Sequence, residues 1–97
     1  MASTSQYFDW DDGNIEHIAR HNVTPLEIEQ VILNYPLDLE TQIDAEDSGE
    51  ERYLQLGATA NGRVLEILIT WRGEKVRVIS AWDAPARQKL RYWMETR

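Results

Sequence analysis

The sequence of 97 residues contains no cysteine, only two histidines, five glycines and three prolines. Without cysteine there is no disulfide framework and no thiolate metal site. No apolar run approaches the roughly 18–20 residues that a membrane-spanning helix needs. The first ten residues, MASTSQYFDW, lack the basic flank and the apolar stretch of a signal peptide. We therefore expect a cytoplasmic protein without membrane attachment and without a cofactor.

What is present is ordinary for a globular protein, since 42% of the residues are hydrophobic and 28% are charged. The length fits one domain over residues 1–97, with no internal repeat and no linker.

The net charge of −7 is divided unevenly along the chain. Residues 1–51 hold 13 acids and one base, a net charge of −12, whereas residues 52–97 hold 4 acids and 9 bases, a net charge of +5. Such asymmetry indicates a polyanion-binding surface built by one part of the chain. The alternative is that the acidic residues only keep a small protein in solution.

The first third of the chain predicts a short strand followed by two helices. Tyr7–Trp10 alternates weakly, and Asp11 or Asp12 can cap a helix that follows. Thr24–Glu27 reads Thr-Pro-Leu-Glu, a capping box with proline at the first helical position. The second helix ends at Tyr35, before Pro36.

Beyond residue 36 the period of the apolar residues changes to that of strands. An acidic loop, AEDSGEE, separates the first two strands, and Asn61-Gly62 forms a tight turn after the second. A last helix follows Asp83 and runs through residue 96, with Ala86, Leu90, Trp93 and Met94 on one face. Because consecutive strands with short turns pair as a meander, the sequence predicts an α+β domain with a mainly antiparallel sheet. The expected strands span residues 37–44, 52–59, 64–71 and 76–81.

Both histidines lie in the first helix, where Asn14, His17 and His21 fall within an arc of roughly 60°. Ile15, Ile18 and Ala19 should face the core, so we expect the arc of the histidines to be exposed.

Three interpretations of the pair remain open. His17 and His21 are one turn apart, as in metal sites, but the sequence between them has no glutamate as in the zinc-protease motif, and no third histidine or cysteine completes a ligand set. An imidazole also serves as a general base near neutral pH. The third interpretation is a solvated pair near a helix C-terminus.

The basic half of the chain carries the candidate phosphate ligands. Guanidinium groups bind phosphate through paired hydrogen bonds and stabilise a pentacovalent phosphate. Tyr92 offers a stacking surface for an unpaired base, whereas we expect Trp10, Trp71 and Trp93 to be core residues. The basic candidates are Arg52, Arg63, Arg72, Lys75 and Arg77 in or beside the strands, and Arg87 and Arg91 on the last helix.

The order and spacing of several motifs resemble the BrnT-like toxin family of bacterial type II toxin–antitoxin systems. The resemblance covers roughly residues 8–92. It rests on Trp10-Asp11, Arg20-His21, Arg52-Tyr53 with Gly57, and Arg77-Val78-Ile79-Ser80-Ala81.

That resemblance implies a RelE-like ribonuclease fold and metal-independent cleavage of RNA. It implies as partner an antitoxin with a DNA-binding segment, in a toxin–antitoxin hetero-oligomer, and a homodimer is also open. In such chemistry the ribose 2′-hydroxyl attacks the adjacent phosphate while a base takes its proton. On this chain Arg52, Arg72 and Arg77 would be phosphate ligands and His17 or His21 the base. Arg63, Lys75, Arg87, Arg91 and Tyr92 would bind RNA.

Three positions depart from the pattern of that family, and the mildest is Asn22, where many relatives have glycine after the histidine. Trp82 follows Ile79-Ser80-Ala81 where a basic residue is common, and Gln88 stands where an acidic residue is common. A second hypothesis is therefore a toxin-fold protein with little or no catalysis that binds its antitoxin. A third, a metal-dependent hydrolase built on His17 and His21, requires a carboxylate close to both.

Overall fold

The structure, a computed structural model, describes residues 6–44 and 49–97. Residues 45–48 of the expected acidic loop lie outside the described part. In order along the chain, the described elements are α1 (Asp12–Ala19), α2 (Pro25–Ile32), β1 (Leu37–Asp44), β2 (Glu50–Ala58), β3 (Val64–Arg72), β4 (Lys75–Asp83) and α3 (Ala86–Thr96).

The four strands form one antiparallel sheet in the order β1-β2-β3-β4, so the predicted α+β meander is confirmed. The short strand expected at residues 7–10 is reduced to one parallel bridge between Phe8 and Val76. There the backbone N–H of Asp9 donates to Val76 O at 2.8 Å, and Val76 N–H donates to Tyr7 O at 2.9 Å. The pairing stops because Asp11 already caps α1.

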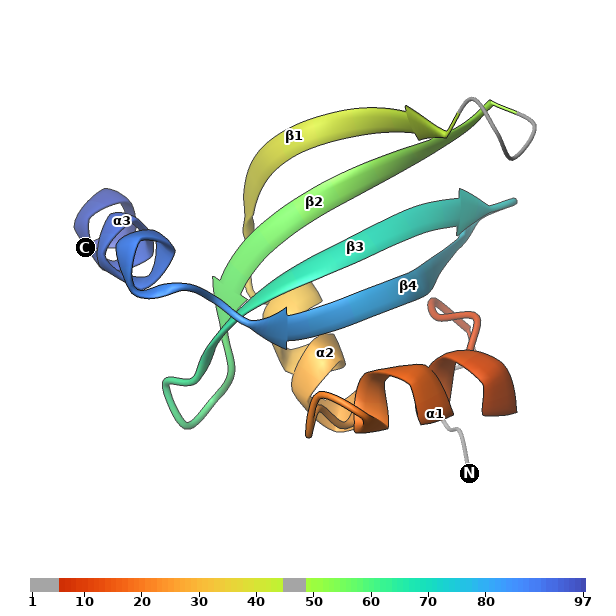
Figure 1. Ribbon diagram of the computed structural model, residues 1–97, viewed down its shortest axis with the longest axis horizontal. Helices are drawn as coiled ribbons and strands as arrows, with labels where there is room; N and C mark the ends of the chain where they lie inside the picture. The colour runs from red at the N-terminus through yellow and green to blue at the C-terminus, as the bar shows by residue number, and fades with distance from the viewer. Residues whose placement is uncertain (1–5, 45–48) are drawn as a thin grey trace.

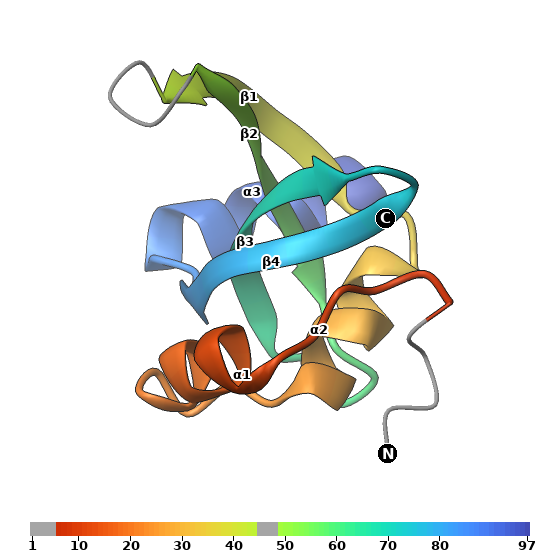
Figure 2. The ribbon, with the colours of Figure 1, turned by 90° about the vertical axis from the view of Figure 1, so that its right-hand side faces the viewer.

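The two faces of the sheet are covered differently. α1 and α2 lie together against one face, whereas α3 lies at the end of the sheet where β2 and β4 finish (Figures 1 and 2). The larger core cluster joins α1 and α2 to the sheet and contains Phe8, Ile18, Val23, Ile28, Val31, Leu65, Ile67, Ile69, Val76, Val78 and Ala81. A smaller cluster under α3 contains Leu56, Ala58, Val64, Ala84 and Tyr92.

Both helices of the first layer begin with capping boxes. The sequence predicts the box of α2, whereas for α1 it predicts only a cap at Asp11 or Asp12. The Thr24 hydroxyl accepts from Glu27 N–H at 3.2 Å, and the Glu27 carboxylate accepts from Thr24 N–H at 3.0 Å. In α1 the reciprocal partners are Asp11 and Asn14.

The expected exposure of Asn14 is wrong, because its side chain is 4% exposed. Its amide donates to Asp9 O at 2.9 Å and to Val78 O at 3.3 Å. The side chain thereby joins the N-terminal segment, α1 and β4, and burial without these partners would be costly. Asn14 is therefore part of the packing of α1 on the sheet.

Arg63, just before β3, connects the first layer to the sheet. Its Nε donates to Asp83 Oδ1 at 2.8 Å and its Nη1 to Asn22 O at 2.7 Å. Nη1 also donates to both carboxylate oxygens of Glu27, at 3.1 and 3.0 Å, and Nη2 to His21 O at 3.4 Å. One guanidinium thus holds the α1–α2 turn, the start of α2 and the end of β4 together.

Trp71 and Trp93, expected in the core, are exposed instead, as are several other large apolar side chains. Trp71 and Trp93 are about half exposed, and Tyr35 projects almost entirely into solvent. On α3, Leu90 and Met94 are also exposed, while Tyr92 is the residue that packs inward. Helical spacing predicts which side chains share a face but not which face meets the core.

Gly57 of β2 lies close against Val31 of α2. A Cβ placed there would lie 2.7 Å from Val31 Cγ1 and 3.3 Å from Pro36 Cβ. We expect Gly57→Ala to lower the free energy of unfolding by about 1–3 kcal/mol, because overpacking strains a filled core. Urea unfolding with an unchanged m value would measure this change.

The double variant Gly57→Ala/Val31→Ala supplies the control, because it removes the methyl group that the new Cβ meets. In the Val31→Ala background, Gly57→Ala should be neutral or stabilise by up to about 1 kcal/mol through the entropy of the unfolded chain. An equal loss of stability in both backgrounds would contradict the proposed contact.

Candidate active site

The face of the sheet opposite α1 and α2 is left partly open by α3. Val64 and Leu56 are buried under α3, whereas Leu54 and Leu68, further along the strands, are only half-buried. We call this surface the open face. In its centre, Glu66 of β3 lies between Leu56 of β2 and Trp82 of β4 in the strand register.

Glu66 is a buried carboxylate, 7% exposed, with two side-chain donors. The indole Nε1–H of Trp82 donates to Oε1 at 2.6 Å, and the amide of Gln88 donates to Oε2 at 3.4 Å. Hydrogen bonds to both oxygens of a carboxylate fix its orientation. Trp82 and Gln88 therefore hold Glu66 in one position between β4 and α3.

A cavity of about 650 Å³ opens beside Gln88 at the start of α3, and its described lining comprises Pro85, Arg87, Gln88 and Arg91. Arg91 Nε pairs with Glu95 Oε2 at 2.8 Å, with both side chains nearly half exposed. Because exposed pairs of this kind contribute little, Arg91 can exchange Glu95 for a stronger anion. The cavity thus combines two guanidinium groups with an amide that contacts a buried carboxylate.

The model of a known family, described as the ribonuclease toxin BrnT of type II toxin–antitoxin systems, matches residues 10–88. The chain belongs to this BrnT toxin family. No curated protein matches the chain. Membership in a type II family implies an antitoxin protein as partner, and the match includes both Glu66 and Gln88. The matched range also includes Arg87, at the start of α3, which lines the cavity.

In this BrnT-family chain, the residues that we expected to be catalytic lie in separate places. His17 of α1 is half-buried, with Nε2 at 3.1 Å from Ser80 Oγ of β4. His21 is exposed, and the two imidazole rings are 6.1 Å apart between centroids. Because Ser80 lies two residues before Trp82, His17 borders the edge of the open face.

Arg77 binds the N-terminal segment. Its Nη1 lies 3.0 Å from Asp11 Oδ2 and 3.4 Å from Asp9 Oδ2. The hydrogen bond from Arg77 is the main cause that lowers the pKa of Asp11, and the same bond raises the pKa of Arg77. The guanidinium is thereby held by carboxylates at the sheet edge.

The remaining basic candidates fall into separate groups. Arg72 Nη1 lies 2.8 Å from Glu50 Oε2, and Arg52 Nε lies 3.8 Å from Glu50 Oε1, at the end of the sheet far from α3. Lys75 is exposed at the start of β4. Arg63 makes the internal contacts described above.

Tyr92, expected to stack on a base, is buried at 5% exposure in the cluster under α3. This expectation is wrong, because the ring fills the space between α3 and the sheet and Trp93 occupies the exposed side of the helix. Sequence reasoning also missed Glu66. The available signal was a single carboxylate within the apolar run VLEILITW.

Within residues 6–44 and 49–97, no group of three or more His, Cys, Asp or Glu side chains is arranged to hold a metal ion. Among the same residues, no helix is both long enough and apolar enough to cross a bilayer.

We expect Arg63→Met to lower the free energy of unfolding by about 2 kcal/mol at pH 7, because charge-assisted hydrogen bonds are lost while the aliphatic stem is kept. Burial raises the pKa of Glu27, but the N–H of Thr24 and the Arg63 guanidinium outweigh it, and the pKa lies below its ordinary value of 4.5. The hydrogen bond from Arg63 lowers the pKa of Asp83 below 3.8. Depressed carboxyl pKa values stabilise the fold above the unfolded pKa.

The difference between the wild type and Arg63→Met should therefore shrink as the pH falls below 3.8. Urea unfolding of both proteins at a series of pH values, from neutral to acidic, measures this difference in the free energy of unfolding. Arg72→Met is the matched control, since Arg72 is 45% exposed and pairs at the surface, and it should change stability by less than about 1 kcal/mol. Equal losses for both variants, or a difference independent of pH, would contradict the role of Arg63.

Proposed function

We propose that the chain is a metal-independent endoribonuclease toxin that binds RNA on the open face. The observation that carries this proposal is the buried carboxylate of Glu66, which Gln88 links to the cavity of Arg87 and Arg91. Membership in a family of ribonuclease toxins supports it.

Cleavage without a metal needs a proton acceptor and cations beside the phosphate. The ribose 2′-hydroxyl attacks phosphorus, and the 5′-oxygen leaves and takes up a proton from water. The products are a 2′,3′-cyclic phosphate and a 5′-hydroxyl end. Glu66 would accept the proton of the 2′-hydroxyl, and Arg87 and Arg91 would stabilise the charge that builds on the phosphoryl oxygens. Trp82 and Gln88 would keep the carboxylate oriented.

The catalytic and RNA-binding residues assigned from the sequence remain part of the proposal, with changed roles. His17, beside Ser80 at the edge of the open face, is the second candidate for the base. His21 lies in the turn after α1, with its ring centroid 6.1 Å from that of His17. Arg52, Arg72 and Lys75 would bind RNA at the far end of the sheet. Arg77 is better placed as a positioning residue, since Asp9 and Asp11 hold its guanidinium.

The test is cleavage of a labelled RNA by the purified chain in EDTA, with identification of the new ends. We expect a 2′,3′-cyclic phosphate end and a loss of about 10²–10⁴-fold in rate for Glu66→Gln. The amide of that variant still accepts from Trp82, so the fold should be retained. Arg87→Ala/Arg91→Ala should lose about a hundredfold.

Two matched variants control for charge and surface effects. Glu16→Gln changes an exposed glutamate of α1, and Lys89→Ala removes an exposed cation of α3 next to the proposed site. Both should cleave at the wild-type rate. A rate lost in His17→Ala but kept in Glu66→Gln would move the base to His17, and activity that EDTA abolishes would contradict the metal-independent mechanism.

A second candidate function is antitoxin binding without catalysis. The exposed apolar side chains around Trp71 favour it, because they lie away from the open face and suit a protein partner. A folded wild-type chain that leaves RNA intact, under conditions in which an active member of the family cleaves it, would support this function.

A further inference from the structure

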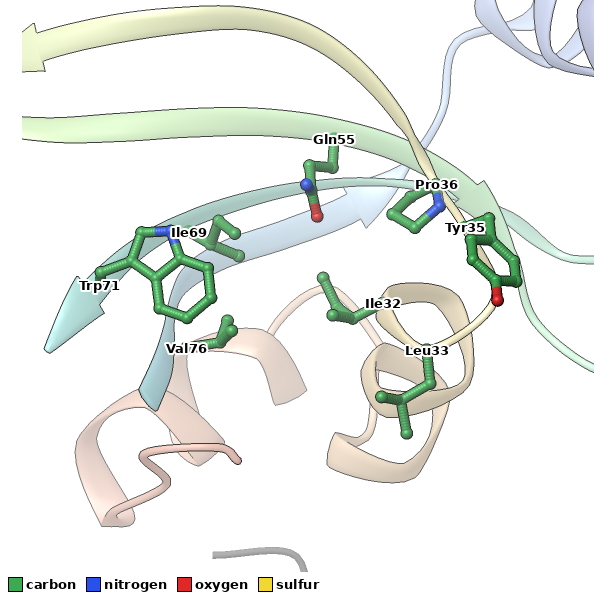
Figure 3. Close-up of a pocket in the computed structure, with 8 residues that line it drawn as sticks. All are labelled: Ile32, Leu33, Tyr35, Pro36, Gln55, Ile69, Trp71 and Val76. Atoms are coloured by element: carbon green, nitrogen blue, oxygen red, sulfur yellow. The ribbon is translucent and has the colours of Figure 1, made fainter. Parts of the chain in front are cut away.

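An apolar groove lies between the C-terminal end of α2 and the β3–β4 hairpin (Figure 3). It has a volume of about 430 Å³ and is on the side of the sheet that carries α1 and α2, away from the open face. Leu33 and Trp71, at its rim, are 63% and 52% exposed. The described lining comprises Ile32, Leu33, Tyr35, Pro36, Gln55, Ile69, Trp71 and Val76. Exposed apolar side chains gathered around a groove are typical of protein-binding sites.

Tyr35 is held at this rim at a conformational cost. It has φ of +53°, in the left-handed region that a bulky side chain rarely adopts, and it is 91% exposed. Its ring therefore gains little from packing in the free chain. Strain that persists without a packing benefit is a feature of binding and functional segments.

The surroundings of the groove are acidic. Its described lining contains no charged residue, and Arg72 and Lys75 face the other side because they alternate with Trp71 and Val76 along the strands. Arg72 is also paired with Glu50.

Acidic side chains, by contrast, border the groove at two places. Asp38 Oδ1 accepts from Gln55 Nε2 at 2.8 Å. On its far side Trp71 borders a second cavity lined also by Glu51. Glu50 in the same lining is already paired with Arg72 and Arg52, so Glu51 supplies the acidic charge there. A segment that fills the groove would therefore be attracted if it is basic.

Gln55 adds an unused hydrogen-bond acceptor. Its Nε2 is fixed by Asp38, and no group in the described part of the chain donates to its buried Oε1. In Figure 3 this oxygen points toward the space between Ile69 and Ile32. A donor from an occupant could reach it after a small rotation of the amide, which would satisfy a group that is costly to leave unpaired.

We propose that this groove is the docking site for the antitoxin protein, and that it takes a segment with apolar anchor side chains flanked by lysine or arginine. The family implies the antitoxin as a partner, and the acidic border of the groove selects the charge of the segment. Because the groove lies away from Glu66 and α3, docking there does not depend on whether the chain cleaves RNA.

The test is titration of the purified cognate antitoxin into the chain by calorimetry. Leu33→Lys and Trp71→Lys should raise Kd by at least about tenfold, because each removes an apolar contact and adds a charge that repels a basic segment. Both residues are more than half exposed, so the substitutions leave the core intact. Wild-type affinity should also fall as salt is added.

Leu26→Lys is the matched control, because Leu26 lies on α2, the helix that Leu33 caps, is 64% exposed and is not part of the described lining. It should change Kd by less than about twofold. Unchanged affinity for Leu33→Lys and Trp71→Lys, or an equal loss for Leu26→Lys, would overturn the proposal. So would a dimer of this chain that Leu33→Lys dissociates while its affinity for the antitoxin stays the same.

Tyr35→Gly separates binding from folding. Glycine adopts positive φ without strain, so this variant should raise the unfolding midpoint in urea while it weakens antitoxin binding. A purely structural role for Tyr35 would give no loss of affinity, and that result would count against the docking surface.

Discussion

The packing of α1 and α2 against the sheet depends on the guanidinium of Arg63, which joins segments that are distant in sequence. Arg63 donates to the α1–α2 turn, to Glu27 in the capping box of α2 and to Asp83 at the end of β4. Because Glu27 also accepts from Thr24, the start of the second helix and the end of the sheet share one network of hydrogen bonds. Helices of eight residues are marginal alone, so this network and the core beneath it position α1 and α2.

The uneven charge of the sequence is partly explained by contacts within the fold. Asp9 and Asp11 of the acidic half bind Arg77, Glu27 binds Arg63, and Glu50 binds Arg72. Basic residues of the second half of the chain thus neutralise acidic residues of the first half. Fewer basic side chains are therefore left to bind a polyanion. Arg87 and Arg91 remain at a cavity, and the proposed RNA site moves with them toward α3.

Local sequence signals predicted most helices and strands, whereas the burial of single side chains and the candidate site depend on tertiary contacts. The capping boxes, the turn after β2 and the α+β meander follow from short-range chemistry. Asn14 was wrongly expected to be exposed, because its amide donates to the backbone carbonyls of Asp9 and Val78, and the sequence does not show the contact with Val78. The carboxylate of Glu66 becomes a site only through Trp82 and Gln88, whose positions relative to it are set by strand register and by the docking of α3.

At the start of β1 the chain passes from the groove to the side of the sheet that carries α3. Pro36 lines the groove, while Leu37, the next residue, packs on the cluster that contains Tyr92 of α3. The edge of β4 near the groove is already occupied, because Phe8 bridges Val76 and Arg77 binds the N-terminal segment. A chain anchored in the groove would therefore reach the side of α3 most directly around the outer edge of β1. A partner confined to the groove would leave Arg87 and Arg91 uncovered, so exclusion of RNA from the open face would require a segment that continues along this route.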